Sequence, residues 1–150
     1  MRLGTPLARA ILAAGIVSGL LASPALAMPP DREPALSDPF ASEDCGFEVD
    51  VMFPKQHETA TTFYDQAGNV RKIHISGQLH IQFTNPANGR TVVVSASGRL
   101  VIDFVKGRSL ALGTGAGPSP LGGIIVGHGQ FGLDGVPIHG TSRNLCPLLA

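Results

Sequence analysis

Long runs of alternating apolar and polar residues constrain this chain more than any other feature of its sequence. Between residues 70 and 84 the odd positions are mostly apolar, as at Ile73, Ile75 and Leu79, and the even positions are mostly polar. The alternation resumes over residues 92–104, with the apolar residues now on even positions. A period of two puts side chains of one kind on one face of an extended strand, so both runs predict half-buried β-strands.

Each run also carries an internal glycine. The pattern Ser-Gly-x-Leu-x-Ile-x-Phe occurs at residues 76–83 and again at 97–104. If the two runs form a hairpin about the loop 85–90, Gly77 faces Gly98 and the apolar residues of both strands share one face. Facing glycines inside long strands are typical of a sheet that bends sharply over its core. We therefore expect this sheet to curl.

Shorter extended segments account for most of the remaining chain after residue 44. No segment beyond residue 27 shows the period of an amphipathic helix, and Leu110 and Leu112 are expected to continue the inner apolar face. Asp134-Gly135 predicts a hairpin turn. The fold class predicted is all-β: an antiparallel meander of about eight strands forming a small closed or partly open β-barrel, with a β-sandwich as the alternative. The other expected strands lie at residues 47–53, 59–64, 121–126, 127–133 and 136–141.

The first 27 residues have the features of a secretory signal peptide. Arg2 and Arg9 supply positive charge, an apolar stretch follows, and Ala25-Leu26-Ala27 forms a small-x-small cleavage site. Residues 28–43 contain four prolines and no periodic pattern, which predicts a flexible leader. Alternatively, they form an ordered arm that packs on the domain through Phe40. Residues 44–150 then form a single β-domain, and the protein is expected to be secreted and extracellular.

The two cysteines fit an oxidising compartment. Cys45 precedes the first predicted strand of the domain, and Cys146 follows the last one. In an exported chain with no third cysteine, a disulfide between them is the simplest interpretation, with free thiols or an intermolecular bridge as alternatives. A spacing of 101 residues does not match a metal-binding or redox Cys-x-x-Cys pair.

Charge and composition argue against several classes of function. The chain has 11 basic and 11 acidic residues, and the predicted cleavage removes two arginines, so the mature net charge becomes −2. This balance gives no electrostatic case for binding nucleic acid or an anionic membrane. With no tryptophan and one tyrosine, stacking on sugars or bases is also poorly supported. No later segment is long and apolar enough to predict a membrane span.

Motifs for catalysis or cofactor binding are weak. Residues 127–132 match G-x-G-x-x-G, but a dinucleotide site needs a helix after this loop, and a hairpin is predicted instead. No G-x-S-x-G elbow occurs, so a hydrolase nucleophile is not indicated. We assign no catalytic, cofactor-binding or metal-binding residue. The only reactive set worth testing is the five histidines, which we expect to lie on solvated faces: His57, His74, His80, His128 and His139.

Several segments resemble a group of small secreted actinobacterial proteins of no known activity. They are Cys45-Gly46-Phe47, the loop Asn85-Pro86-x-Asn88-Gly89-Arg90, Ser97-Gly98-Arg99-Leu100 and Leu145-Cys146. The resemblance implies a compact β-domain and no particular activity. As a fold, the bent hairpins are also similar to the small barrels of allene oxide cyclases and dirigent proteins.

The expected function is that of an exported, non-catalytic β-module without a cofactor. Its partner would be a small apolar ligand held on the inner face or a cell-envelope protein bound at a sheet edge. The alternative is a cofactor-free lyase or isomerase that uses one histidine as acid and base inside a small barrel. A hollow lined by a histidine and a carboxylate would favour the enzyme, and an apolar hollow would favour the binding module.

Overall fold

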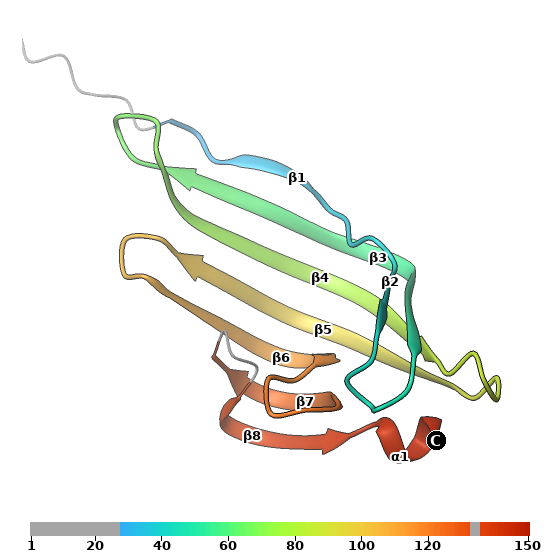
Figure 1. Ribbon diagram of the computed structural model, residues 1–150. Helices are drawn as coiled ribbons and strands as arrows, with labels where there is room; N and C mark the ends of the chain where they lie inside the picture. The colour runs from blue at the N-terminus through green and yellow to red at the C-terminus, as the bar shows by residue number, and fades with distance from the viewer. Residues whose placement is uncertain (1–27, 133–135) are drawn as a thin grey trace, which may run out of the picture.

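The computed structural model describes residues 28–132 and 136–150 and confirms the all-β fold class (Figure 1). The predicted signal peptide and the Asp134-Gly135 turn lie outside the described residues. Among those described, eight strands form one antiparallel sheet, and one short helix follows them. The elements are β1 (Asp31–Ala35), β2 (Phe40–Ser42), β3 (Val49–Tyr64), β4 (Val70–Thr84), β5 (Thr91–Asp103), β6 (Arg108–Pro118), β7 (Ile124–Phe131), β8 (Pro137–Asn144) and α1 (Cys146–Leu149).

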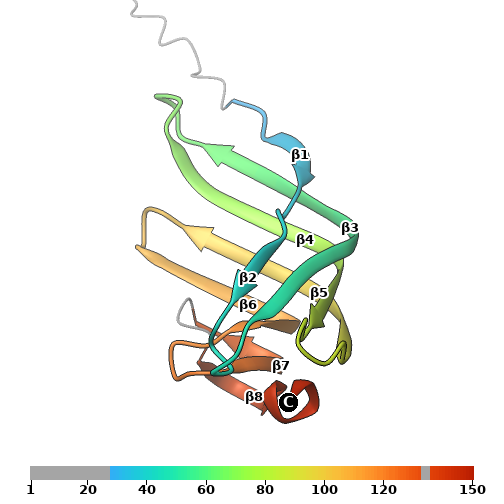
Figure 2. The same cartoon turned by 45° about the vertical axis from the view of Figure 1, so that its right-hand side comes forward.

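The sheet is a meander in which consecutive strands pair from β3 to β8. Its order is β1-β3-β4-β5-β6-β7-β8, and β2 pairs with β3 beside β1. In the described residues no pairing joins β1 to β8, so the sheet has two edges and is not closed into a barrel. The long strands β3, β4 and β5 run side by side, while β6, β7 and β8 curl away below them (Figures 1 and 2).

The proline-containing leader differs from the flexible segment that its sequence predicted. Both β1 and β2 pair with β3, and the Gln56 side chain hydrogen-bonds to the backbone N–H and C=O of Ser37 between them. The Phe40 ring lies 6.2 Å from the ring of Phe53. This is the alternative arrangement, an ordered arm packed on the domain, and backbone pairing supplies the order that the residue pattern does not encode.

The predicted hairpin register between β4 and β5 is confirmed. Gly77 pairs with Gly98, Ile75 with Leu100 and Ile81 with Val94. The pairing continues across the sheet, because Gly98 pairs with Gly113, Gly113 with Gly129 and Gly129 with Gly140. We call these five aligned residues the glycine row: Gly77, Gly98, Gly113, Gly129 and Gly140.

The glycine row marks a line where the strands approach too closely for side chains. All five residues have positive φ values, between +123° and +157°. A Cβ at any of them would collide with a backbone carbonyl oxygen of the neighbouring strand. At Gly113, for instance, the added atom would also lie 2.8 Å from the Cα of Gly98. Only glycine tolerates this backbone and this approach, so the row lets the sheet bend along one line.

The expectation that Leu110 and Leu112 lie on the inner face is wrong. Leu100 pairs with Ala111 and Gly98 with Gly113, so the odd residues of β6 share the face of the even residues of β5. Residues that pair directly across antiparallel strands lie on the same face. Leu112 is accordingly 43% exposed on the other face.

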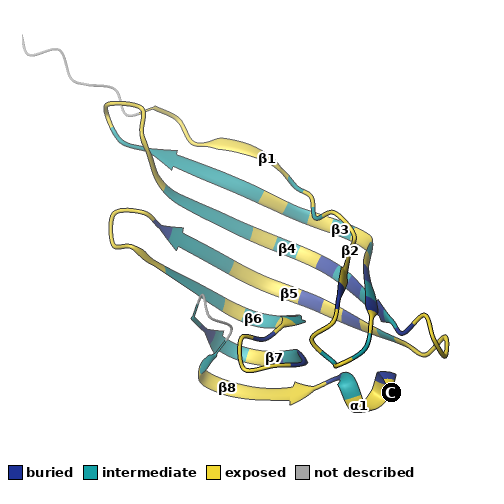
Figure 3. Cartoon of the chain, viewed as in Figure 1, coloured by how far each residue is buried: buried dark blue, intermediate teal, exposed yellow. Residues whose placement is uncertain are grey.

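The core is concentrated at the end of the sheet that carries the disulfide, where most of the buried segments in Figure 3 lie. Phe83, Val49 and Ile124 are fully buried there, and Leu149 of α1 packs in the same cluster. The far end of the long strands is a single layer with mostly half-buried residues. The other members of the core cluster are Val51, Leu79, Ile81, Val94, Ala96 and Leu145.

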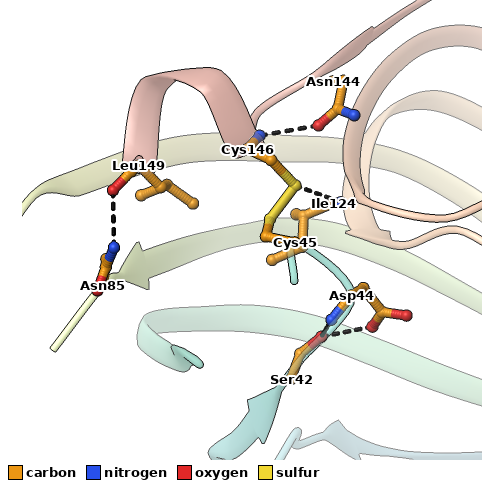
Figure 4. Close-up of a disulfide and its surroundings, with 8 residues drawn as sticks. All are labelled: Ser42, Asp44, Cys45, Asn85, Ile124, Asn144, Cys146 and Leu149. Atoms are coloured by element: carbon orange, nitrogen blue, oxygen red, sulfur yellow. Dashed lines mark hydrogen bonds between the residues drawn. A yellow bond between two sulfur atoms is a disulfide. The ribbon is translucent and has the colours of Figure 1, made fainter. Parts of the chain in front are cut away.

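The two ends of the domain meet beside this core, as the cysteine positions predicted (Figure 4). Cys45 and Cys146 form a disulfide with a Cα–Cα distance of 5.3 Å. Beside it, the Gly123 backbone N–H donates to the Asp44 carbonyl at 2.9 Å. The buried Asn85 amide donates to the Leu149 carbonyl, also at 2.9 Å, which fixes α1 against the β4–β5 loop. A disulfide and polar contacts therefore hold the two ends of the domain together at this end of the sheet.

Candidate functional site: an apolar groove at a fork in the sheet

The candidate site begins where strands β5 and β6 separate. Their pairing runs from Asp103 and Arg108 to Ser97 and Thr114, and it stops beside the glycine row. Beyond this point β6 continues to pair with β7, while β5 continues to pair with β4. The sheet thus forks, and backbone and side chains on the two sides of the fork enclose a groove.

Two adjoining hollows, of about 200 and 290 Å³, make up this apolar groove. They share Leu100, Ala111 and Phe131 as walls, together with the β6 residues Gly115 and Ala116. The smaller hollow reaches Ile75 and Leu79 on β4, and the larger one reaches Ile125 on β7. Protein sites for small molecules have this character, with predominantly apolar walls and few polar groups.

Glycines give the groove its depth. Gly115 and Gly117 lie on β6, and a Cβ on either would meet no atom within 4 Å. Gly127 on β7 lies beside the tip of the Phe131 ring, and a Cβ there would collide with that ring. The bare backbone of β6 therefore leaves space, and Gly127 makes room for the Phe131 ring that forms one wall.

One carboxylate, Glu58 on β3, lines the smaller hollow. It pairs with Gly77 of the glycine row, which places it at the bend. Burial raises the pKa of Glu58 above its ordinary value, because the charged carboxylate loses water. A group in this position favours a ligand that offers a hydrogen-bond donor or a positive charge.

Of the five histidines, none lines the groove in the described residues. His57, His128 and His139 are exposed, and His128 Nδ1 lies 2.8 Å from Thr114 Oγ1. His80 pairs with Lys55, and His74 pairs with Thr61. Within the described residues, no three histidine, cysteine, aspartate or glutamate side chains gather closely enough to hold a metal ion.

His74 lies on the opposite face, at the far end of the long strands. Its ring is 4.9 Å from that of Phe63, and it lines a hollow of about 470 Å³ together with Lys72 and Asp103. Burial, followed by the charges of Lys72 and Arg99, lowers the pKa of His74, so the ring is neutral at neutral pH. The Asp103 carboxylate accepts a hydrogen bond from the Lys106 backbone N–H and pairs with Lys72 Nζ at 3.7 Å, rather than with His74.

Sequence reasoning missed Glu58, Ala111 and Phe131 as groove residues. For Ala111 and Phe131, the signal that identifies them is the glycine row. Once Gly98 is aligned with Gly113, and Gly113 with Gly129, the register brings Leu100, Ala111 and Phe131 into one line. The disulfide residues were predicted because they needed no register.

Comparison of the chain with protein-family models, with curated proteins and with solved structures finds no match. Among the described residues, the helix is too short to cross a membrane.

Proposed function

We propose that this protein is an exported, non-catalytic module that binds a small apolar ligand in the groove at the β5–β6 fork. The observation that carries the proposal is the groove wall. In the larger hollow every lining residue is apolar or glycine. When an apolar ligand covers such a surface, water is released from both. This stabilises the complex by about 25 cal/mol per Å² of apolar area buried. The smaller hollow adds Glu58, which would orient a donor group.

Export is part of the proposal. The signal-like segment 1–27 and the Cys45–Cys146 disulfide both support an extracellular protein. We further propose that the curled sheet acts as a partly open barrel. The described strands belong to one continuous sheet rather than the two sheets of a sandwich, which supports this assignment. The actinobacterial group resembled by the Cys-Gly-Phe and Leu-Cys segments is the proposed family.

Expression in a secreting bacterial host tests both the proposed export and the proposed ligand binding. The chain, expressed with its predicted signal peptide (residues 1–27), should appear in the culture medium with residue 28 at its N-terminus. Native mass spectrometry of this material should detect a co-purified small molecule. Titration with N-phenyl-1-naphthylamine, which fluoresces in apolar sites, should give a saturable signal.

A groove-filling variant makes the test specific. Ala111→Phe places a ring in the space shared by both hollows and should abolish saturable dye binding. Val93→Phe adds a comparable ring at a position that is 56% exposed and outside the groove, so its binding should be unchanged. If both variants lost dye binding equally, or if Ala111→Phe still bound the dye, a site at the fork would be contradicted.

The lyase or isomerase alternative has one supporting observation. His74 shares a hollow with Asp103, and its lowered pKa leaves it able to accept a proton at neutral pH. Asp103 already contacts Lys72 and the Lys106 N–H, so its carboxylate does not serve as the partner of His74 in acid–base catalysis. Turnover of any recovered ligand that is lost in His74→Gln but retained in Ala111→Phe would favour the enzyme.

A further inference from the structure

The far end of the sheet carries exposed apolar side chains at the tip of a hairpin. The turn 104–107 joins β5 to β6, and in it Phe104 is 53% and Val105 65% exposed. The backbone N–H of Phe104 donates to the Arg71 carbonyl at 3.0 Å, so this turn is held against the start of β4. Exposing two adjacent apolar side chains to water at this anchored turn is unfavourable in free energy. Such exposed apolar side chains are typical of a surface that contacts a membrane or another protein.

Basic side chains surround this tip. Val105 lines one hollow with Arg71, Lys72 and Lys106. A second hollow, of about 440 Å³, shares Lys72 and Lys106 with the first and adds Arg108 beside Ile138, Leu110 and Val101. We call these four cations and the turn residues Phe104 and Val105 the basic tip.

Two carboxylates near the basic tip offset part of its positive charge, because Asp103 pairs with Lys72 and Asp65 lies near Arg71. Asp103 lines both hollows with 10% of its side chain exposed, and it is held by the Lys106 N–H and Lys72. Asp65 accepts hydrogen bonds from the backbone N–H groups of Ala67 and Asn69 within its own turn.

Most of the acidic residues lie in an early part of the chain. Seven of the 11 acidic residues lie between positions 31 and 50, in or beside β1, β2 and the start of β3. The balanced net charge, which gave no case for an anionic membrane, therefore conceals an uneven distribution of charge. Acidic Asp31 does reach the neighbourhood of the tip, where it accepts a hydrogen bond from Tyr64 of the first hollow. A local basic surface acts over about one Debye length, so its sign decides what it attracts.

We propose that the basic tip docks this protein on a bilayer that contains anionic phospholipid. Phe104 and Val105 enter the interface between headgroups and acyl chains, and Arg71, Lys72, Lys106 and Arg108 lie at the level of the lipid phosphates. Cations that surround exposed apolar side chains match this layered partner, because it presents negative charge outside and hydrocarbon beneath. A soluble anion would satisfy the cations but leave the apolar tip in water.

Tryptophan fluorescence can test insertion directly, because the chain contains no tryptophan. Phe104→Trp places one reporter at the tip, and Val93→Trp places one at a comparably exposed position on β5, outside the basic tip. With vesicles of phosphatidylglycerol and phosphatidylcholine, the emission of Phe104→Trp should shift to the blue, and that of Val93→Trp should not. Pure phosphatidylcholine vesicles should shift neither.

Charge neutralisation tests the electrostatic part. Each basic residue near an anionic surface contributes about fivefold in partitioning, so Lys106→Gln with Arg108→Gln should weaken vesicle binding about 25-fold. The matched control, Lys55→Gln with Arg143→Gln, removes equal charge at exposed sites outside the tip and should change binding much less.

The proposal would be overturned by no blue shift for Phe104→Trp, by an equal shift for both reporters, or by equal binding to both kinds of vesicle. A concentration-dependent dimer that buries the tip without vesicles would also overturn it, by showing that a second copy is the occupant.

Discussion

Replacing Gly113 with alanine tests whether the glycine row is required for the fold. Gly113 lies in the middle of the row, with φ of +123°, and an added Cβ would collide with the Ser97 carbonyl oxygen. A non-glycine residue in such a backbone conformation costs about 1–3 kcal/mol. Pushing β6 away from β5 to relieve the collision also weakens a ladder hydrogen bond, which contributes about 1 kcal/mol.

The expected loss is therefore about 2–4 kcal/mol in the free energy of unfolding. For a domain of this size that corresponds to a decrease in Tm of roughly 8–16 °C. Thermal and urea unfolding of the oxidised protein, followed by far-ultraviolet circular dichroism, measure both quantities. The slope of the unfolding free energy against urea concentration should stay unchanged if the variant alters stability alone.

Gly115→Ala is the matched control, on the same strand and two residues away. Gly115 has no positive φ, and its added Cβ would meet nothing within 4 Å. Its stability should change by less than about 1 kcal/mol, in the stabilising direction if the unfolded chain loses freedom. The reasoning is refuted if Gly113→Ala is as stable as the parent, or if Gly115→Ala is destabilised equally.

Three further perturbations address the clasp and the basic tip. Replacing Cys45 and Cys146 by serine releases a loop of about 100 residues, so the free energy of unfolding measured in urea should fall by up to about 4.7 kcal/mol. A parent protein that is equally stable with and without reductant would contradict this. Asn85→Ala should cost about 1–3 kcal/mol by leaving the Leu149 carbonyl with one partner fewer, whereas a change below 0.5 kcal/mol would show that α1 does not depend on it. The Lys106 N–H, and then the Lys72 charge, lower the pKa of Asp103 below 3.8. The ionised carboxylate therefore stabilises the fold above pH 3.8, and this stabilisation is lost as the pH falls through the lowered pKa. The difference in unfolding free energy between the parent and Asp103→Asn should close on acidification, and a constant difference would argue against a role for the ionised carboxylate.

The sequence predicts the β4–β5 hairpin well because two independent signals agree there. The alternation defines which residues share a face, and Gly77 opposite Gly98 keeps that phase across the bend. The same reasoning fails at Leu110 and Leu112. The turn 104–107 pairs Asp103 with Arg108, so even positions on β5 face odd positions on β6, and residue hydrophobicity alone does not reveal that register.

Aligning the glycines supplies the missing register. Gly98 with Gly113, Gly113 with Gly129, and Gly129 with Gly140 each fix the pairing of one hairpin. The groove could be inferred from that alignment only in part. The fork depends on where β5–β6 pairing stops, and that is a property of the whole curled sheet. The leader strands were missed because edge pairing of β1 and β2 uses backbone groups and leaves no alternation in the sequence.

The glycine row also separates the part of this small sheet that carries the core from the two surfaces for which we propose binding. On one side of the row the disulfide, α1 and the fully buried Phe83 close the strands over a core. On the other side the long strands continue as a single layer, with half-buried faces and the exposed Val105. A flat sheet of this width would need a second layer to bury either face. Bending along a line of glycines lets one end of the sheet cover itself, and it leaves the fork and the far end free to contact other molecules.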